Sequence, residues 1–204
     1  MKQLSKIIKL IAIKLEKKIF NFVLPLVFKR DITIISSNCI GTRIYQSAKK
    51  RYSSPTINLW MKPADFIKFT ERLDFYLEQE LIEYSDPQKN YPCGKLCDIK
   101  LFFQHYRTFD EAKSKWQERT KRTCTDNFLI IFTDRDGATI QDIKRIAEQK
   151  NAIVFCSSNK REYLKSVPNI VFIDGSEDQV GDLYSNYHQL LYRFPFKKVL
   201  NYEK

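Results

Sequence analysis

Short apolar runs alternate with longer amphipathic stretches over most of the chain, and this alternation predicts an α/β fold. The expected strands are residues 32–35, 99–103, 128–132, 152–156 and 170–173. The expected helices are residues 63–81, 110–122, 140–147 and 180–191, where apolar side chains recur every three or four residues. Because most of these strands are continuous apolar runs, they are typical of a mainly parallel sheet that helices cover on both faces. The predicted fold class is therefore a three-layer α/β domain.

The first 30 residues differ from the rest in both pattern and charge. Leu4, Ile7, Ile8, Ile11 and Leu15 recur at helical spacing, with lysines between them. Residues 1–30 hold eight Lys and Arg residues against one Glu, which accounts for +7 of the formal charge of +11. We therefore divide the chain into a basic amphipathic helical arm, residues 1–30, and a single α/β domain, residues 31–204.

Two interpretations of the arm remain open. In the first, residues 1–28 lie as an amphipathic helix on an anionic membrane, where apolar burial and the attraction of lysines to lipid add together. In the second, the helix packs on its own domain or on a partner subunit. The longest uncharged run, residues 19–28, is about half the length that spans a bilayer, and Lys9 and Lys14 interrupt the apolar stretch that a secretion signal needs. The expected location is the cytoplasm, peripheral to the inner face of the cell membrane under the first interpretation.

Composition argues against several classes of site and partner. The five glycines form neither G-x-G-x-x-G nor G-x-x-x-x-G-K, so no nucleotide site of either type is expected. The positive charge is concentrated in the arm, which argues against nucleic acid as a partner. The five cysteines are scattered and odd in number, as expected of free thiols in a reducing compartment. Cys93 and Cys97 lack a second ligand pair, so no metal site is expected.

Candidate chemistry lies in the turns that follow the predicted strands, because ligands of parallel α/β sheets collect outside the carboxyl ends of the strands. The turn after residues 32–35 carries Ser37, Asn38, Cys39 and Gly41. Cys39 lies near the start of the next helix, where backbone N–H groups favour a thiolate and can hold an oxyanion. Asn38 can donate its amide to the same oxygen.

Two further turns offer a base and charged groups. His105 follows residues 99–103 and is a candidate general base. Asp134, Arg135 and Asp136 follow residues 128–132 and can orient a base, hold a metal or bind an anion. A buried cysteine, a structural histidine and a helix-capping aspartate are the purely structural alternatives for these positions.

Six segments, in this order, resemble an uncharacterised bacterial family often labelled exopolysaccharide biosynthesis proteins, whose members occur among capsule and surface-polysaccharide genes. The segments are IISSNCIG (34–41), SPTINL (54–59), YPCGKL (91–96), HY (105–106), AKSKWQER (112–119) and TDRDG (133–137). The resemblance covers roughly residues 30–175 and implies a pathway rather than a reaction. It also implies that Asn38, Cys39, His105 and Asp134 are functional, because they lie inside the matching segments.

Two positions depart from the pattern of that family. Thr42 stands where the family tends to have a second glycine, which suggests a less open turn. Cys93 replaces a small aliphatic residue, which argues further against a metal site at Cys93 and Cys97. The dipeptide Asn38-Cys39 is also similar to that of a capsule-polysaccharide acetyltransferase family that binds coenzyme A.

The leading hypothesis is a transferase that modifies a surface polysaccharide or its lipid-linked precursor by acyl transfer. Cys39 is then the nucleophile or an oxyanion contributor, His105 is the base, and Asp134 or Asp136 orients that base. Arg135 or Lys95 would bind the phosphates of coenzyme A or of a nucleotide sugar. The predicted substrate-binding residues are Ser37, Asn38, Gly41, Lys95 and Arg135.

Two other functions remain open. The first is glycosyl transfer, in which the acidic turn at residues 134–136 holds a divalent metal against a nucleotide sugar. The second is a non-catalytic, membrane-docked assembly factor for the polysaccharide machinery.

Overall fold

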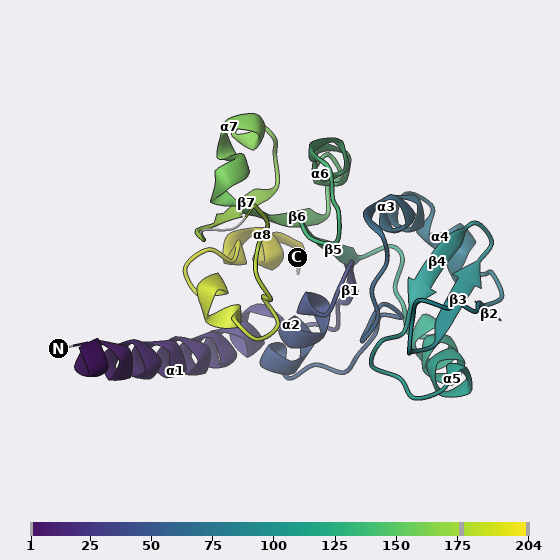
Figure 1. The fold of residues 1–204 in the computed structure, drawn as a ribbon, viewed down its shortest axis with the longest axis horizontal. Coiled ribbons are helices and arrows are strands. Elements are labelled where there is room, and N and C mark those ends of the chain that lie inside the picture. The colour runs from purple at the N-terminus through teal and green to yellow at the C-terminus, as the bar shows by residue number, and fades with distance from the viewer. Residues whose placement is uncertain (1, 176–177, 203–204) are drawn as a thin grey trace.

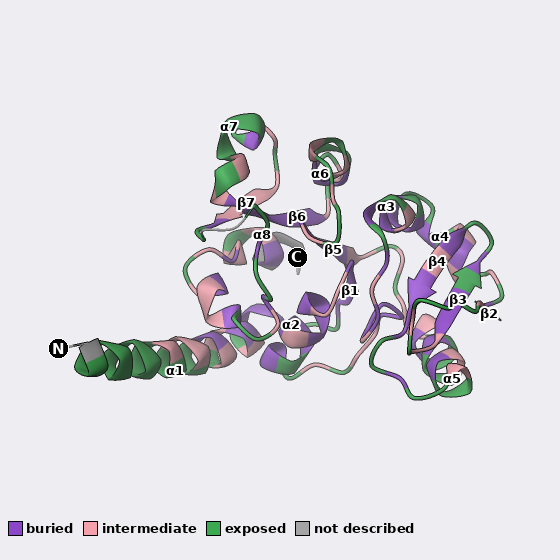
Figure 2. Cartoon of the chain, viewed as in Figure 1, coloured by how far each residue is buried: buried purple, intermediate pink, exposed green. Residues whose placement is uncertain are grey.

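The computed structural model describes residues 2–175 and 178–202 and is built around a four-stranded parallel sheet (Figure 1). Its strands, in spatial order, are β1 (Thr33–Ser36), β5 (Phe128–Thr133), β6 (Ala152–Ser157) and β7 (Ile170–Ile173). Each strand pairs in parallel with its neighbour. Nearly every residue of β1, β5 and β6 is buried, as expected of strands that are covered on both faces (Figure 2).

Two hydrophobic cores lie on the opposite faces of this sheet. The helices around it are α1 (Lys2–Val27), α2 (Ile40–Ala48), α3 (Pro63–Glu71), α4 (Leu73–Leu77), α5 (Phe109–Thr120), α6 (Ile140–Ala147), α7 (Arg161–Leu164) and α8 (Phe196–Tyr202). Ile35 and Ile130 point into the first core, with side chains of α3, α5 and α6. Their neighbours Ile34 and Ile131 point into the second core, with side chains of α1, α2 and α8. The predicted three-layer α/β fold and its mainly parallel sheet are confirmed.

A second, antiparallel sheet packs beside the first core. It consists of β2 (Ile82–Glu83), β3 (Cys93–Leu96) and β4 (Ile99–Phe102), in that order. The run at 99–103 is therefore a strand, as predicted, but it belongs to this small sheet. Leu101 and Phe103 belong to the first core, so both sheets share one hydrophobic interior. Trp60 joins the small sheet through a backbone bridge to Phe102, and the two rings stack with centroids 4.2 Å apart.

Two predicted helices differ in the structure. The helix expected at 63–81 is broken at Arg72, whose φ of −134° and ψ of 48° are not helical, so α3 and α4 are separate. The apolar spacing continues across the break because both helices face the same core. The helix expected at 180–191 is instead a series of turns that ends in the 3₁₀ helix η2 (Tyr187–Leu190). Its buried residues, such as Val180 and Leu183, reach the second core from these turns.

Local signals explain where α5 and α6 begin. Helix α5 is capped by Thr108, whose hydroxyl accepts the Glu111 N–H, two residues before the predicted cap at Asp110. Helix α6 begins with a reciprocal capping box between Thr139 and Asp142. The short helices η1 (Ser158–Lys160) and α7 connect β6 to β7.

The N-terminal arm is a continuous helix, α1, as its apolar spacing predicts. Its C-terminal part packs on the second core through Phe20, Leu24 and Val27, whereas residues 3–12 are exposed and project from the body (Figures 1 and 2). Among the described residues, none of the helices has the length and apolar character that crossing a membrane requires.

Candidate functional site

The backbone brings Cys39 to the end of the sheet and places it immediately before α2. Strand β1 ends at Ser36, and Cys39 is the N-cap residue of α2. Helix and strand approach closely here because residue 41 is a glycine: a Cβ on Gly41 would lie 2.6 Å from the Cβ of Ser36. The Gly41 N–H also donates to Ser36 Oγ at 3.2 Å. Gly41 is therefore a close-packing position that fixes the start of α2.

Asn38 ties the ends of two neighbouring strands together. Its Nδ2 donates to Thr133 Oγ1, at the end of β5, at 2.7 Å. Its Oδ1 accepts the Ile40 N–H at 3.3 Å, in the first turn of α2. The Asn38 side chain thus holds the Cys39 backbone against β5, and its second amide hydrogen is left for another acceptor.

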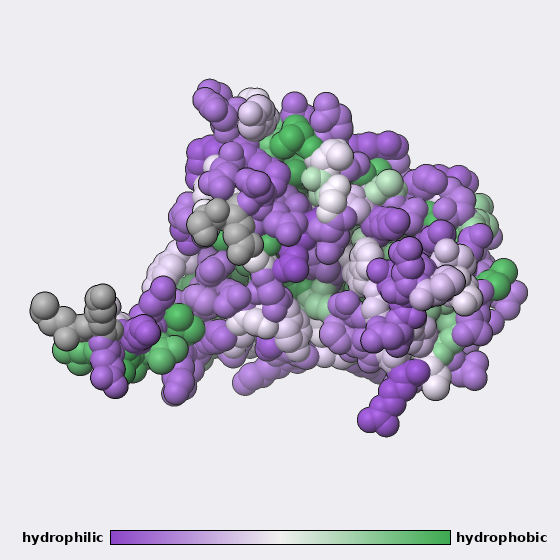
Figure 3. All heavy atoms as spheres, viewed as in Figure 1, coloured by the Kyte–Doolittle hydropathy of each residue, from purple (hydrophilic) through white to green (hydrophobic). Residues whose placement is uncertain are grey.

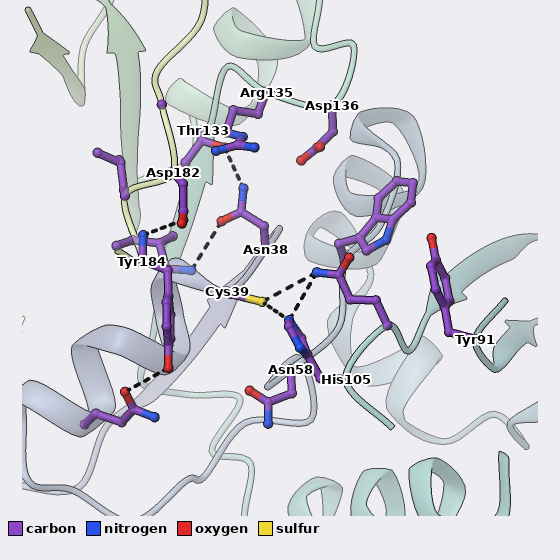
Figure 4. A pocket seen from close by; sticks show the side chains of 16 residues that line it. Asn38, Cys39, Asn58, Tyr91, His105, Thr133, Arg135, Asp136, Asp182 and Tyr184 are labelled. Carbon is purple, nitrogen blue, oxygen red and sulfur yellow. Dashed lines mark hydrogen bonds between the residues drawn. The ribbon is translucent and has the colours of Figure 1, made fainter. Parts of the chain in front are cut away.

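His105 and Gln104 meet Cys39 from the small sheet, in the turn that follows β4. The Cys39 Sγ lies 3.2 Å from His105 Nε2, although the two residues are 66 positions apart (Figure 4). Gln104 Nε2 lies 3.8 Å from the same sulfur and 3.2 Å from His105 Nε2. A thiol, an imidazole and an amide donor therefore meet at one point, as predicted for Cys39 and His105 but not for Gln104.

The next residue, Tyr106, anchors this turn in the core. Its hydroxyl donates to the Ile57 carbonyl at 3.1 Å and accepts from the guanidinium of Arg119 at 2.6 Å. Arg119 is only 7% exposed and also donates to Ile57. Because each of these polar groups is buried and paired, moving the turn would break several hydrogen bonds at once.

The electrostatic surroundings favour the neutral thiol of Cys39. Burial raises its pKa above the ordinary thiol value, and the carboxylates of Asp182 and Asp136 raise it further. The Gln104 amide and the Arg135 guanidinium lower the pKa, but they do not overcome these effects. Cys39 therefore needs a base at the moment of attack, and His105 Nε2 is within reach of its proton.

Asp134 has a different position from the one predicted. Its carboxylate is only 2% exposed and accepts from the Ser157 N–H (2.9 Å), the Val180 N–H (2.8 Å) and Lys160 Nζ (2.8 Å). Ser157 is the last residue of β6, Lys160 lies in η1 and Val180 lies in the C-terminal segment. Within the described residues both hydrogen bonds of His105 are made by Nε2, to Cys39 and Gln104. The expected Cys–His–Asp triad with Asp134 is therefore not assembled, because the buried donors of three other segments take up its oxygens.

Other predicted residues divide between the pocket and the protein interior. Arg135 and Asp136 line the pocket beside Cys39, and Asp136 occupies the left-handed region at φ 60°. Ser37 is buried: its carbonyl accepts the Met61 N–H, and its hydroxyl has no hydrogen-bond partner among the residues that the structure describes. Lys95 is exposed on β3 of the small sheet and is not among the pocket residues.

The pocket forms because the chain leaves β1 and β5 toward opposite faces of the sheet. After β1 it enters α2, on the second core, and after β5 it enters α6, on the first core. This divergence opens a crevice at the carboxyl ends of the two strands. The crevice has a volume of about 590 Å³, and the labelled side chains of Figure 4 surround it.

Several lining residues were not predicted, and they give the pocket its character. Aromatic rings are supplied by Trp60, Tyr91 and Tyr184, and polar groups by Asn58 and Asp182. Asn58 and Tyr91 lie inside segments that carry the family resemblance, so that signal was present in the sequence. Asp182 and Tyr184 come from the 180–191 turns. Because a helix was expected there, the sequence did not indicate that these two side chains reach the pocket.

Two findings bear on metal chemistry and on the cysteines. All five cysteines are free thiols, and Cys93 is buried while Cys97 is exposed. Across residues 2–175 and 178–202, no group of three or more His, Cys, Asp and Glu side chains is arranged to hold a metal ion. With both oxygens of Asp134 already bonded, Asp136 is the carboxylate that this turn presents to the pocket.

Comparison with known proteins places the chain in a family. Residues 11–200 match the family described as "Domain of unknown function (DUF1919)". A protein of Haemophilus influenzae, described as "Uncharacterized protein", is 38% identical over 159 residues, which cover 76% of this chain and 75% of the relative. The resemblance to an uncharacterised bacterial family is confirmed at this level, whereas its polysaccharide label stays a prediction. The chain belongs to the DUF1919 domain family.

Proposed function

We propose that the protein is a transferase that carries an acyl group on Cys39 and modifies a surface polysaccharide or its lipid-linked precursor. The observation that carries this proposal is the 3.2 Å contact between Cys39 Sγ and His105 Nε2 at the edge of a substrate-sized pocket. A cysteine at a helix start with a histidine within hydrogen-bonding distance is the arrangement that thiol-dependent acyl transfer requires. The polysaccharide context comes from the family resemblance and is part of the proposal.

The reaction needs two balanced steps. In the first, Cys39 Sγ attacks the carbonyl carbon of an ester or thioester donor as His105 Nε2 takes the thiol proton. The bond to the leaving group breaks, and His105 returns the proton to that group. In the second, a hydroxyl of the acceptor attacks the Cys39 thioester while His105 takes its proton. The C–S bond then breaks, and the thiol recovers a proton from His105.

Amide donors are positioned to stabilise the oxyanion of each step. Gln104 Nε2, 3.8 Å from the sulfur, is close enough to reach an oxygen on a carbonyl carbon bound to Sγ. The N–H groups of Ile40 and Gly41, at the start of α2, already donate to Asn38 Oδ1 and Ser36 Oγ, so the second amide hydrogen of Asn38 Nδ2 is the donor that can join Gln104. Gln104 is therefore assigned a catalytic role that the sequence did not indicate.

The lining of the pocket favours a sugar over a polyanion. The rings of Trp60, Tyr91 and Tyr184 offer apolar faces for the C–H groups of a sugar ring, and Asn58 and Asp182 offer partners for its hydroxyls. Two carboxylates and one guanidinium line the cavity, so a diphosphate inside it would meet net negative charge. If coenzyme A is the donor, its phosphates lie outside the pocket.

An acyl-enzyme trapping experiment tests the proposal. The protein is incubated with acetyl-coenzyme A or with the activated ester p-nitrophenyl acetate, and the acyl group is located by peptide mass spectrometry. We expect an acyl adduct on Cys39 that is lost when a saccharide acceptor is added. Cys97→Ser, which changes an exposed thiol outside the pocket, is the matched control and should keep the adduct.

Two results would contradict the proposal. One is the absence of a Cys39 adduct with every donor while the exposed cysteines are acylated. The other is unchanged polysaccharide acylation in cells that carry Cys39→Ala. Stabilisation by manganese together with a nucleotide sugar, without any adduct, would favour glycosyl transfer instead.

A further inference from the structure

The exposed side of α1 carries a continuous apolar stripe. Its members are Leu4, Ile8, Ile11, Leu15, Ile19, Phe22 and Leu26, which are between 39% and 71% exposed. Together they form most of the large exposed hydrophobic side chains of the described residues. Ile7, which is also exposed, lies at the edge of the stripe, and the exposed Leu10 lies off it. Figure 3 shows hydrophobic residues (green) next to hydrophilic ones (purple) on the projecting part of this helix. A surface of this kind on one helix indicates a site of interaction.

We propose that α1 lies flat on the surface of an anionic lipid bilayer, with this stripe in the bilayer interface and the α/β domain on the opposite side of the helix. The proposal is independent of the acyl-transfer reaction, because it rests on α1 alone.

The direction of the stripe follows from helix geometry. At 100° per residue, the stripe lies on the side of the helix opposite to Phe20, Leu24 and Val27, which are buried in the second core. The contact with the body therefore fixes the rotation of α1 about its axis. Phe22 and Leu26 stay 71% and 59% exposed even where the helix is packed on the domain. The packing of α1 on the domain therefore keeps the apolar stripe exposed.

The spacing of the stripe favours a flat surface over a second helix. Its intervals are four, three, four, four, three and four residues, which average about 3.7, near the 3.6 of a straight α-helix. The stripe thus runs straight along one side of α1. A left-handed coiled coil with a second copy of this chain would require a 3.5-residue repeat, which drifts around the helix.

The charge of α1 favours an anionic bilayer over a neutral one. The helix carries six lysines and one glutamate. Lys14 and Lys18 flank one edge of the stripe, whereas Lys6, Lys9 and Lys17 lie toward the far side of the helix, about one helix diameter (~10 Å) away, which is close to the Debye length at physiological salt. These cations are therefore attracted to anionic headgroups while the stripe is buried among acyl chains.

Vesicle sedimentation with the full-length protein tests the proposal. The vesicles contain either equal parts of phosphatidylglycerol and phosphatidylcholine or phosphatidylcholine alone. We expect wild-type protein to sediment with the anionic vesicles and much less with the neutral ones. A variant with Lys14 and Lys18 changed to Gln should bind anionic vesicles about 25-fold more weakly, because each lysine near the surface contributes about fivefold.

Apolar variants complete the experiment. The triple change Ile8→Gln, Ile11→Gln and Leu15→Gln should abolish sedimentation while leaving circular dichroism and thermal unfolding unchanged, because all three side chains are exposed. The matched control changes Ile82→Gln and Tyr163→Gln, two similarly exposed apolar residues elsewhere, and should bind as wild type does.

Three outcomes would overturn the proposal. One is that the wild type and the variant changed at Ile8, Ile11 and Leu15 sediment equally. Another is that the control changed at Ile82 and Tyr163 loses as much binding as that variant. The third is that the wild type does not bind anionic vesicles. If the wild type is instead a dimer by light scattering and the triple variant a monomer, the stripe is an interface between copies of the chain.

Discussion

At the scale of single residues, the contact between Cys39 and His105 determines what the pocket can do. Burial and two carboxylates keep the Cys39 pKa above the ordinary thiol value, so the sulfur is a neutral thiol at neutral pH. His105 Nε2 is 3.2 Å from the sulfur and can remove its proton during attack. The chemistry thus depends on a base rather than on a preformed thiolate.

This arrangement predicts a particular pH dependence. A raised pKa means that the thiolate appears only at higher pH, so iodoacetamide should alkylate Cys39 at a higher pH than it alkylates reduced glutathione. His105→Ala should reduce acylation of Cys39 by p-nitrophenyl acetate at neutral pH by about a hundredfold. It should not reduce alkylation at high pH, where the thiolate forms without a base. Peptide mass spectrometry across a pH series measures both rates.

The opposite behaviour would identify a different mechanism. If Cys39 reacts at neutral pH faster than glutathione and His105→Ala removes that reactivity, then the two residues form a thiolate–imidazolium pair. His105→Gln, which keeps a polar side chain of similar reach, is the control for loss of packing.

At the scale of elements, the pocket depends on how neighbouring segments are held together. Asp134 joins β5 to the segment after β6 and to the C-terminal turns that carry Asp182 and Tyr184. Lys160 donates both to Asp134 and to the Asp178 carbonyl, which strengthens the same connection. The residue predicted to orient a base instead positions one wall of the pocket.

Asp134→Asn should therefore weaken this wall and the fold. We expect the free energy of unfolding to fall by about 3 kcal/mol, because the change leaves the half-buried ammonium of Lys160 without a carboxylate. Urea unfolding followed by fluorescence measures the change. The double variant Asp134→Asn with Lys160→Met removes the unpaired cation and should recover part of the loss. A double variant no more stable than Asp134→Asn would mean that the ion pair is not the source of the effect.

Several elements were predictable and others were not, for physical reasons. The strands β5, β6 and β7 contain apolar runs of four or five residues, and β1 carries Ile34 and Ile35 between two polar residues, so their short length and their β-branched and aromatic residues identify them. The 180–191 turns keep a helix-like spacing of apolar residues because those residues meet the second core, although the backbone is not helical. Gln104 carries no motif, and its role depends on a turn from another sheet reaching Cys39. Such a contact has no local signature in the sequence.

At the scale of the whole molecule, α1 has two parts with different roles. Residues 3–12 are exposed, whereas Phe20, Leu24 and Val27 complete the second core under the sheet. The sequence predicted the helix and left its environment open, because an amphipathic pattern does not say what covers each side. The structure assigns one side of the C-terminal part to the domain.

Two truncations should separate these parts. Deleting residues 3–12 should change the free energy of unfolding by less than about 1 kcal/mol, because only exposed side chains are lost. Deleting residues 2–27 should lower it by about 5 kcal/mol or more, since three buried apolar side chains leave the second core. Urea midpoints compare the two proteins. Equal midpoints would show that α1 contributes nothing to the core.

Cys39 follows a strand of the parallel sheet and His105 follows a strand of the small sheet, and this has a consequence for how the reactivity of the thiol can be controlled. Cys39 moves with β1 and α2, whereas His105 moves with β4 and the buried bonds of Tyr106. Any ligand, mutation or surface that shifts one sheet against the other lengthens the 3.2 Å contact. The rate at which Cys39 reacts with a thiol reagent therefore reports how the two sheets are aligned. This rate can be measured in solution without a substrate.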